Sequence, residues 1–146
     1  MTRVDFYVLT QPDIERRWDY ACKLTEKAFS LGNSVYLHTD NEQHATALDS
    51  MLWSFKPGSF VPHQRIEHND AGNEAIAAPV MIGCRQAPTE SVDILINLSA
   101  SVPDFFTRFE RVIEIVIQTP YVVQQTRDNY RFYRDRGYPL STHNIR

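Results

Sequence analysis

Short hydrophobic runs recur along the chain and predict strands. Runs rich in β-branched and aromatic residues are typical of buried strands. They occur at residues 3–9, 34–38, 78–84, 92–99 and 111–117. Because such runs recur with longer segments between them, the pattern indicates about five strands in one sheet.

The segments between several of these runs have helical periodicity. Apolar residues at helical spacing predict a long amphipathic helix over 13–31. A second helix is predicted from Asp40 to Trp53, with Asp40 and Gln43 resembling a capping box. Residues 103–109 suggest one or two helical turns, and a proline at the first turn predicts a last helix over 120–136.

Alternation of strands and helices at these lengths predicts an α/β fold. We expect a three-layer domain over residues 1–146, with a mostly parallel sheet and helices on both faces. The five glycines form neither GxGxxG nor GxxxxGK[ST], so the fold is Rossmann-like without a glycine-rich phosphate loop. The polar segment 56–77 is predicted to be a long functional or mobile loop.

Composition indicates a globular protein without a cofactor. Apolar residues make up 42% and charged residues 23% of the 146 residues, as in soluble domains. Cys22 and Cys84 lack metal-ligand spacing, so neither a metal site nor a disulfide framework is predicted. No apolar run is long enough to cross a membrane and nothing resembles a signal peptide, so we expect a cytoplasmic location.

Charge is divided unevenly along the chain. Residues 1–107 carry a formal charge of −6, whereas residues 108–146 carry +3 and contain arginine but no lysine. Arginine pairs with carboxylates through two parallel hydrogen bonds, so this end favours defined acidic partners. The whole-chain charge of −3 argues against direct nucleic-acid binding.

Three polar residues could form a catalytic site. His38 ends a predicted strand, where parallel sheets often place active sites, and Asp40 and His44 follow it. No further partner for a metal or a nucleophile is evident. The carboxylates Glu110 and Glu114, at the predicted strand 111–117, do not suggest a general acid and base. A small α/β enzyme using His38, Asp40 and His44 therefore remains an alternative.

The last predicted helix carries a basic stripe with an aromatic residue in it. Arg127, Arg131 and Arg134 are spaced i, i+4, i+7, and Tyr130 lies between them. The stripe is either a solvated outer face or a pocket for an acidic peptide. In the second case the guanidinium groups would bind carboxylates, and the ring would pack against an apolar side chain.

Two aromatic clusters could complete partner-binding surfaces. Trp53, Phe55 and Phe60 lie around a predicted helix end, where not all can face the sheet, although burial is the commoner role for any one of them. Adjacent rings near Val102, at Phe105 and Phe106, pose the same question.

Several segments together resemble a known family. They are RVDFYVL at the start, residues 47–63, APVMIG, DILINLS, and RDNYRFYRDRGYPL at the end. Their order and spacing resemble, nearly end to end, the chi subunit of bacterial DNA polymerase III holoenzyme.

The resemblance implies a non-catalytic adaptor of the clamp-loader assembly. Such a protein joins the psi subunit to the acidic C-terminal tail of single-stranded DNA-binding protein. Carried over by position, the resemblance assigns Arg127, Tyr130 and Arg131 to tail binding, and it makes Trp53, Phe60 and Val116 apolar pocket positions.

We extend the expected tail site to Arg134 and place the psi surface at Val102, Phe105 and Phe106. The chain departs from its relatives at Val123, where they often carry a basic residue. The affinity for the tail is expected to be modest and sensitive to salt.

Overall fold

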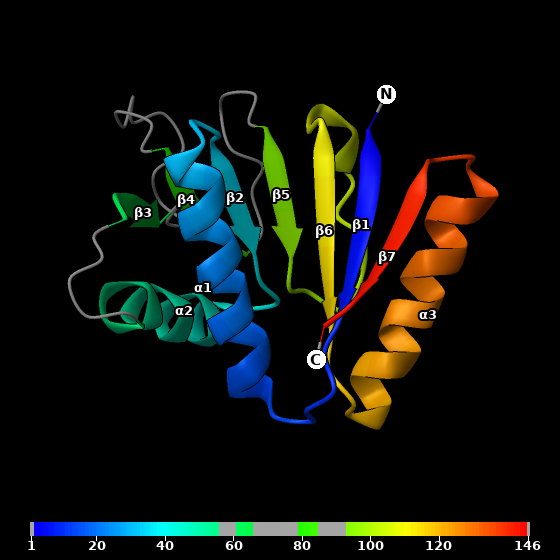
Figure 1. Ribbon diagram of the computed structural model, residues 1–146, viewed down its shortest axis with the longest axis horizontal. Coiled ribbons are helices and arrows are strands. Elements are labelled where there is room, and N and C mark those ends of the chain that lie inside the picture. The colour runs from blue at the N-terminus through cyan, green and yellow to red at the C-terminus, as the bar shows by residue number, and fades with distance from the viewer. Residues whose placement is uncertain (1, 56–60, 66–78, 85–92, 146) are drawn as a thin grey trace.

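The computed structural model describes residues 2–55, 61–65, 79–84 and 93–145. The described elements form one sheet with helices on its two faces (Figure 1). In chain order they are β1 (Arg3–Val8), α1 (Ile14–Ser30), β2 (Val35–His38), α2 (Glu42–Ser54), β3 (His63–Arg65), β4 (Val80–Gly83), β5 (Ile94–Asn97), the 3-10 helix η1 (Phe106–Arg108), β6 (Arg111–Val116), α3 (Pro120–Asp135) and β7 (Leu140–Asn144).

The described strands form a seven-stranded sheet in the order β3-β4-β2-β5-β6-β1-β7, with every pairing parallel. The α/β class is confirmed, and the expected number of strands was too low. The two additional strands, β3 and β7, lie at the edges of the sheet and have polar sequences, HQR and LSTHN. Edge strands need no continuous apolar run, so hydrophobic periodicity did not reveal them.

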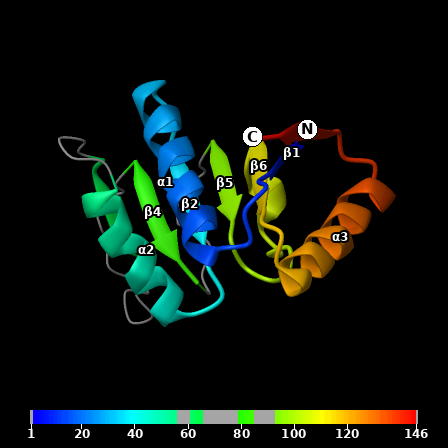
Figure 2. The same cartoon turned by 60° about the horizontal axis from the view of Figure 1, so that its bottom comes forward.

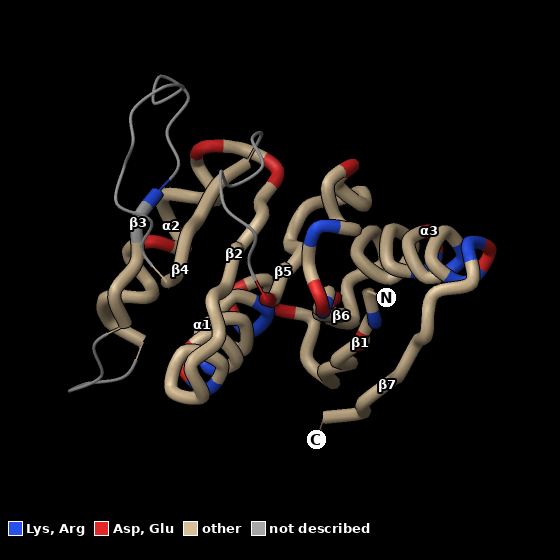
Figure 3. Tube along the Cα trace, turned by 90° about the horizontal axis from the view of Figure 1, so that it is seen from above, with Lys and Arg blue, Asp and Glu red and all other residues tan. Residues whose placement is uncertain are grey.

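The side chains of alternate strand residues enter two separate cores, because successive residues of a strand point to opposite faces. Leu37 and Ile96 pack with the buried residues of α1 and α2. Tyr36 and Leu95 pack with Phe106 of η1 and with α3. Figure 3 accordingly shows α1 and α3 on opposite sides of the row of strands.

The start of α2 differs from the predicted capping box. Asn41 is the N-cap, and its side chain accepts a hydrogen bond from the backbone N–H of His44 at 2.8 Å. Asp40 instead accepts from the backbone N–H of Ala100, at 2.9 Å between Oδ1 and N. Asp40 therefore connects the end of β2 to the loop that follows β5.

The predicted loop 56–77 falls mostly outside the described residues. Within it, His63–Arg65 form β3, which pairs with β4 in parallel register. The last helix, by contrast, is close to its predicted bounds, since α3 runs from Pro120 to Asp135. Gly137 follows it with φ +79°, a conformation that suits glycine after a helix.

Candidate functional site

One side of α3 presents the predicted basic stripe to solvent. The helix buries Val122, Thr126, Asn129 and Tyr133 against the sheet. Arg127, Arg131 and Arg134 lie away from this buried face and are all exposed. Figure 2 shows α3 at one end of the sheet and α2 at the other.

The three arginines differ in their pairing. Arg134 Nη2 lies 3.2 Å from Asp135 Oδ1, in an ion pair whose two side chains are each 59% exposed. Within the described part of the chain, neither Arg127 nor Arg131 has an ion-pair partner. Two guanidinium groups are thus available to carboxylates from outside the chain.

Tyr130 forms an aromatic platform at the edge of this stripe. Its side chain is 37% exposed, and its ring centroid lies 5.2 Å from that of Phe6 on β1. Phe6 is itself buried in the core on the α3 face. The ring is therefore fixed from below while part of it faces solvent, as a contact for an apolar side chain requires.

Val116 and Val123 contribute to the core beneath the stripe. Val116 is 7% exposed and belongs to the same core as Tyr133, so it offers little surface to a partner. Val123 is half-buried and packs against that core. The residue that departs from the family pattern thus adds apolar contact where a charge was expected from the relatives.

The structure does not bring Trp53 next to the α3 stripe. Trp53 lies on α2, whose buried residues pack with those of α1, whereas Tyr133 of α3 packs in the other core. The Trp53 side chain is 56% exposed, and its ring centroid lies 4.6 Å from that of His63. Phe60 lies outside the described residues. Trp53 therefore belongs to a different surface from Arg127.

Of the residues predicted to bind psi, some are partly exposed and one lies in the core. Val102 and Phe105 are half-buried and line an open cavity of about 270 Å³ together with His38 and Cys84. Phe106 is only 5% exposed. It packs in the α3-face core with ring centroids 5.5 Å from Tyr133 and 5.7 Å from Phe132, because η1 turns this ring inward. The expectation that all three residues form one exposed surface is corrected for Phe106.

His38, Asp40 and His44 do not converge on a common point. His38 Nδ1 lies 3.5 Å from the Tyr36 hydroxyl, and its ring contacts Phe105 on the α3 face. The ring of His44 instead packs against Trp18 of α1, with centroids 5.4 Å apart. Burial lowers the pKa of His38 to about 4, so this imidazole is neutral at physiological pH. No grouping of a nucleophile with an oriented base is present at these residues.

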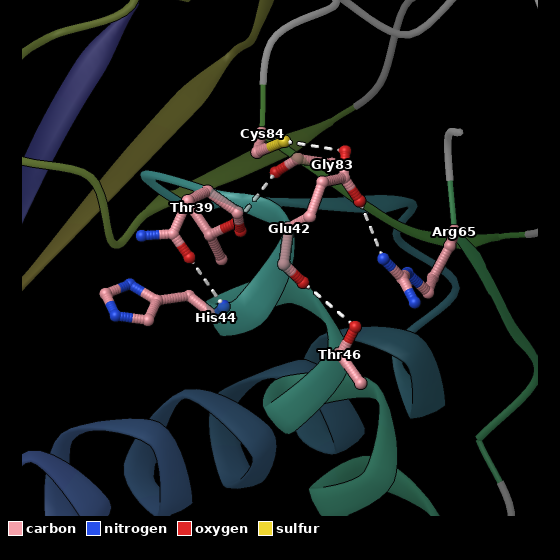
Figure 4. Close-up of polar contacts among 8 residues, drawn as sticks. Thr39, Glu42, His44, Thr46, Arg65, Gly83 and Cys84 are labelled. Carbon is pink, nitrogen blue, oxygen red and sulfur yellow. Dashed lines mark hydrogen bonds and ion pairs between the residues drawn. The ribbon is translucent and has the colours of Figure 1, made fainter. Parts of the chain in front are cut away.

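A separate polar cluster joins the start of α2 to the edge of the sheet. Glu42 accepts a hydrogen bond from Arg65 of β3 at 2.7 Å and one from the Cys84 thiol at 3.0 Å (Figure 4). Thr39 donates to the backbone carbonyl of Gly83 at 3.3 Å. These contacts tie β2, β3 and β4 together. Within the described residues, no three His, Cys, Asp or Glu side chains could hold a metal ion.

A buried carboxylate lies under α3. Glu114 of β6 is 1% exposed and accepts three hydrogen bonds. The donors are Tyr133 Oη at 2.8 Å, Asn97 Nδ2 at 2.9 Å and Asn129 Nδ2 at 3.4 Å. Burial raises the pKa of Glu114, an effect opposed by these bonds and by the buried Arg17 guanidinium. Two amide groups and one hydroxyl, from β5 and α3, thus converge on a single buried carboxyl group.

This role of Glu114 was missed at the level of sequence. Residues 111–117 read RVIEIVI, with a single acidic residue among apolar neighbours. Because a buried charge must be paired or hydrogen-bonded, a lone carboxylate inside such a strand is itself a signal. Its partners could not be identified, since Asn97 comes from another strand and Tyr133 from a distant helix.

The described residues contain no helix long and apolar enough to cross a membrane. The fold also occurs in proteins of very different sequence. A solved structure of T4 UvsW is similar with a TM-score of 0.71 at 8% sequence identity. That similarity covers 99% of this chain and 41% of UvsW, and it concerns the fold alone.

Comparison of sequences is more specific. The family model described as DNA polymerase III chi subunit, HolC, matches residues 1–141. DNA polymerase III subunit chi of Pseudomonas aeruginosa is 43% identical over 145 residues, covering 99% of this chain and 98% of the relative. The subunit of the same name from Escherichia coli is 31% identical over 147 residues, covering 97% of each chain. The chain therefore belongs to the family of chi subunits of DNA polymerase III, a component of the DNA replication machinery.

Proposed function

We propose that this chi-family protein is a non-catalytic adaptor that joins the psi subunit to the acidic C-terminal tail of single-stranded DNA-binding protein. In this role it would belong to the clamp-loader assembly and act in the cytoplasm. The tail would bind on the exposed stripe of α3, and psi would bind on a separate apolar surface.

The observation that carries this proposal is that free guanidinium groups and an anchored aromatic ring lie on the same side of α3. Arg127 and Arg131 are exposed and have no ion-pair partner in the part of the chain that the structure describes. Tyr130 lies on the same side of α3, with its ring against Phe6. An acidic peptide with an apolar terminal residue needs both features, since its carboxylates require cations and its side chain requires an apolar contact.

Arg134 would be a peripheral contact in this arrangement. Its guanidinium is already paired with Asp135, and both side chains of this pair are mostly exposed. An exposed ion pair contributes little free energy and is screened by salt. The tail site is therefore centred on Arg127, Tyr130 and Arg131.

Psi would bind around Val102 and Phe105. These residues line an open cavity together with His38, Cys84 and Asp104, and both side chains are half-buried, so each retains some apolar surface for a partner. Lasting complexes between different proteins have apolar cores, which suits this surface better than the charged stripe of α3. The two partners would then occupy different elements and could bind at the same time.

A bridging assay tests the proposal. A synthetic peptide of the acidic tail is fixed to a surface, and psi is added with and without this protein. We expect psi to be retained only when the adaptor is present, and to be lost when the adaptor carries Arg127→Ala. Retention of psi without the adaptor, or equal retention by wild type and Arg127→Ala, would contradict the proposal.

The contacts of His38, Asp40 and His44 do not favour the enzymatic alternative. The rings of His38 and His44 contact different elements, and Asp40 is engaged with the backbone of Ala100. Replacing both histidines by alanine is expected to leave capture of the tail peptide unchanged. A tenfold weaker capture would show that they contribute to the site.

A further inference from the structure

We propose that Glu114 is a positioning residue for the tail site: from inside the core it fixes the rotation and height of α3, and thereby the direction in which Arg127, Tyr130 and Arg131 point. The inference rests on the proposed function, because it assumes that the exposed stripe of α3 binds an acidic tail.

Glu114 contacts α3 at two points one turn apart. Asn129 and Tyr133 are spaced i, i+4, so both lie on the buried side of the helix and both reach the same carboxylate. Two contacts at different heights on one helix face define its rotation as well as its position along the sheet. A shift by one residue would rotate the helix face by about 100° and remove both contacts.

The stripe is interleaved with these two anchors. Tyr130 directly follows Asn129, and Arg131 lies two residues before Tyr133. The Phe6 ring contacts Tyr130 at 5.2 Å and Tyr133 at 6.1 Å between centroids, which adds a third fixed point on β1. Any rotation of α3 that breaks the bonds to Glu114 therefore also moves the aromatic platform and the two free arginines.

The carboxylate is itself held from the other side. Asn97 Nδ2 donates to Glu114, while Asn97 Oδ1 accepts from the Ser99 hydroxyl at 2.6 Å and from the Ser99 backbone N–H at 3.2 Å. Because its oxygen is engaged, Asn97 cannot turn its amide round without losing both bonds. Its N–H group stays directed at Glu114, and this prevents the carboxylate from swinging away from α3.

A buried carboxyl group is a costly way to hold a helix, because it must be removed from water. An apolar side chain in place of Glu114 would pack at no cost in desolvation, but it would not favour one rotation of α3 over another. Hydrogen bonds with defined donors are directional, whereas apolar packing tolerates small rotations. The network thus supplies orientation to a helix whose exposed side needs it for binding.

Three variants of the full-length protein separate positioning from stability. Tyr133→Phe removes only the hydroxyl donor, and Glu114→Gln keeps the shape but places an N–H group against the donors. Thr126→Val is the matched control, since Thr126 is also buried on the sheet side of α3. Its side chain makes no hydrogen bond within the described residues. The probe is a synthetic acidic tail peptide, titrated well below the melting temperature of every variant.

Loss of one or two hydrogen bonds to a carboxylate should weaken peptide binding about fivefold in Tyr133→Phe and about tenfold in Glu114→Gln. Thr126→Val should change the affinity less than about twofold. The dependence of Kd on salt should also become shallower in the first two variants, because fewer guanidinium groups meet the peptide. A purely structural role would lower the melting temperature and leave that salt dependence unchanged.

Amide hydrogen exchange of α3, measured without peptide, keeps this inference distinct from the proposed function. Faster exchange at 127–134 in Tyr133→Phe and Glu114→Gln, together with weaker binding, supports the positioning role. Unchanged peptide affinity and salt dependence in both variants would overturn it, even if exchange were faster. If the wild type fails to bind the peptide, the proposed function is wrong. In that case hydrogen exchange still tests whether Glu114 anchors α3. Exchange that is as slow in Tyr133→Phe and Glu114→Gln as in Thr126→Val would overturn the anchoring as well.

Discussion

Gly83 of β4 packs directly against the ring of Tyr36 on the neighbouring strand β2. A Cβ atom at residue 83 would lie 3.1 Å from Tyr36 Cε1 and 3.2 Å from Cζ, and closer still to the hydroxyl oxygen. Tyr36 is fully buried and its ring also contacts Phe105 and Phe109. The ring cannot retreat easily, so this position requires glycine for packing.

Gly83→Ala should therefore lower the free energy of unfolding by about 2 kcal/mol, the usual cost of overfilling a packed core. Denaturant titration measures the change. Adding Tyr36→Phe removes the atom nearest to the new methyl group, so the double variant should be more stable than the sum of the two single effects predicts. Strict additivity would show that the hydroxyl does not limit the space at this site.

Acid should destabilise the protein through His38. Burial lowers its pKa in the folded state to about 4 from an ordinary 6.5, so the unfolded chain takes up a proton at higher pH than the folded one. The free energy of unfolding should then fall as the pH drops from 6.5 towards 4, by about 3 kcal/mol at most. His38→Gln, which stays neutral, should show a smaller fall over this range. Identical pH profiles for the two proteins would contradict this assignment.

Psi binding should depend on Val102 and Phe105 and only indirectly on Phe106. Val102→Ser with Phe105→Ser should abolish co-purification with psi while the protein remains folded. Phe106→Ala removes a core ring and should cost about 3 kcal/mol of stability. Binding of psi should persist in Phe106→Ala at temperatures where that variant is folded. Wild-type yields of psi with the Val102 and Phe105 double variant would refute the proposed surface.

Trp53 should have little effect on tail binding. It lies on α2, on a different surface from the α3 stripe, so Trp53→Ala should leave the Kd for the tail peptide within about twofold of the wild-type value. Isothermal titration measures this directly. A tenfold loss would mean that the peptide reaches α2 and that the site is larger than the stripe.

The sequence predicted the sheet interior better than its margins. The runs predicted as strands at 92–99 and 111–117 are mostly apolar, and the central strands β5 (Ile94–Asn97) and β6 (Arg111–Val116) lie within them, with side chains buried on both faces of the sheet. β7 reads LSTHN and is almost entirely exposed, so its strand conformation depends on pairing with β1, which periodicity cannot detect. The pattern of apolar residues along the sequence reflects which positions are buried, and an exposed edge strand has few buried positions.

In the candidate site, too, local relations were predictable from the sequence and tertiary contacts were not. The spacing of Arg127, Arg131 and Arg134 on one helix was sufficient to predict that they share a side of α3, because that relation is local. Whether Phe106 faces solvent depends on how η1 packs against Tyr133 and Phe132, and adjacent rings in a short turn leave this open. The contacts of Glu114 likewise join residues far apart in the chain and required the tertiary structure.

The central claim is that Arg127 is the main carboxylate receptor of an acidic tail, and one titration tests it most directly. The tail peptide is titrated against wild type, Arg127→Ala and Arg134→Ala at low and at physiological salt. Arg127→Ala should lose about 2 kcal/mol of binding free energy, because its guanidinium is free to pair with a shielded carboxylate. Arg134→Ala should lose less than about 1 kcal/mol, since it is exposed and already paired with Asp135. Small and equal losses for both variants would contradict the claim, for they would mean a diffuse basic face with no defined site.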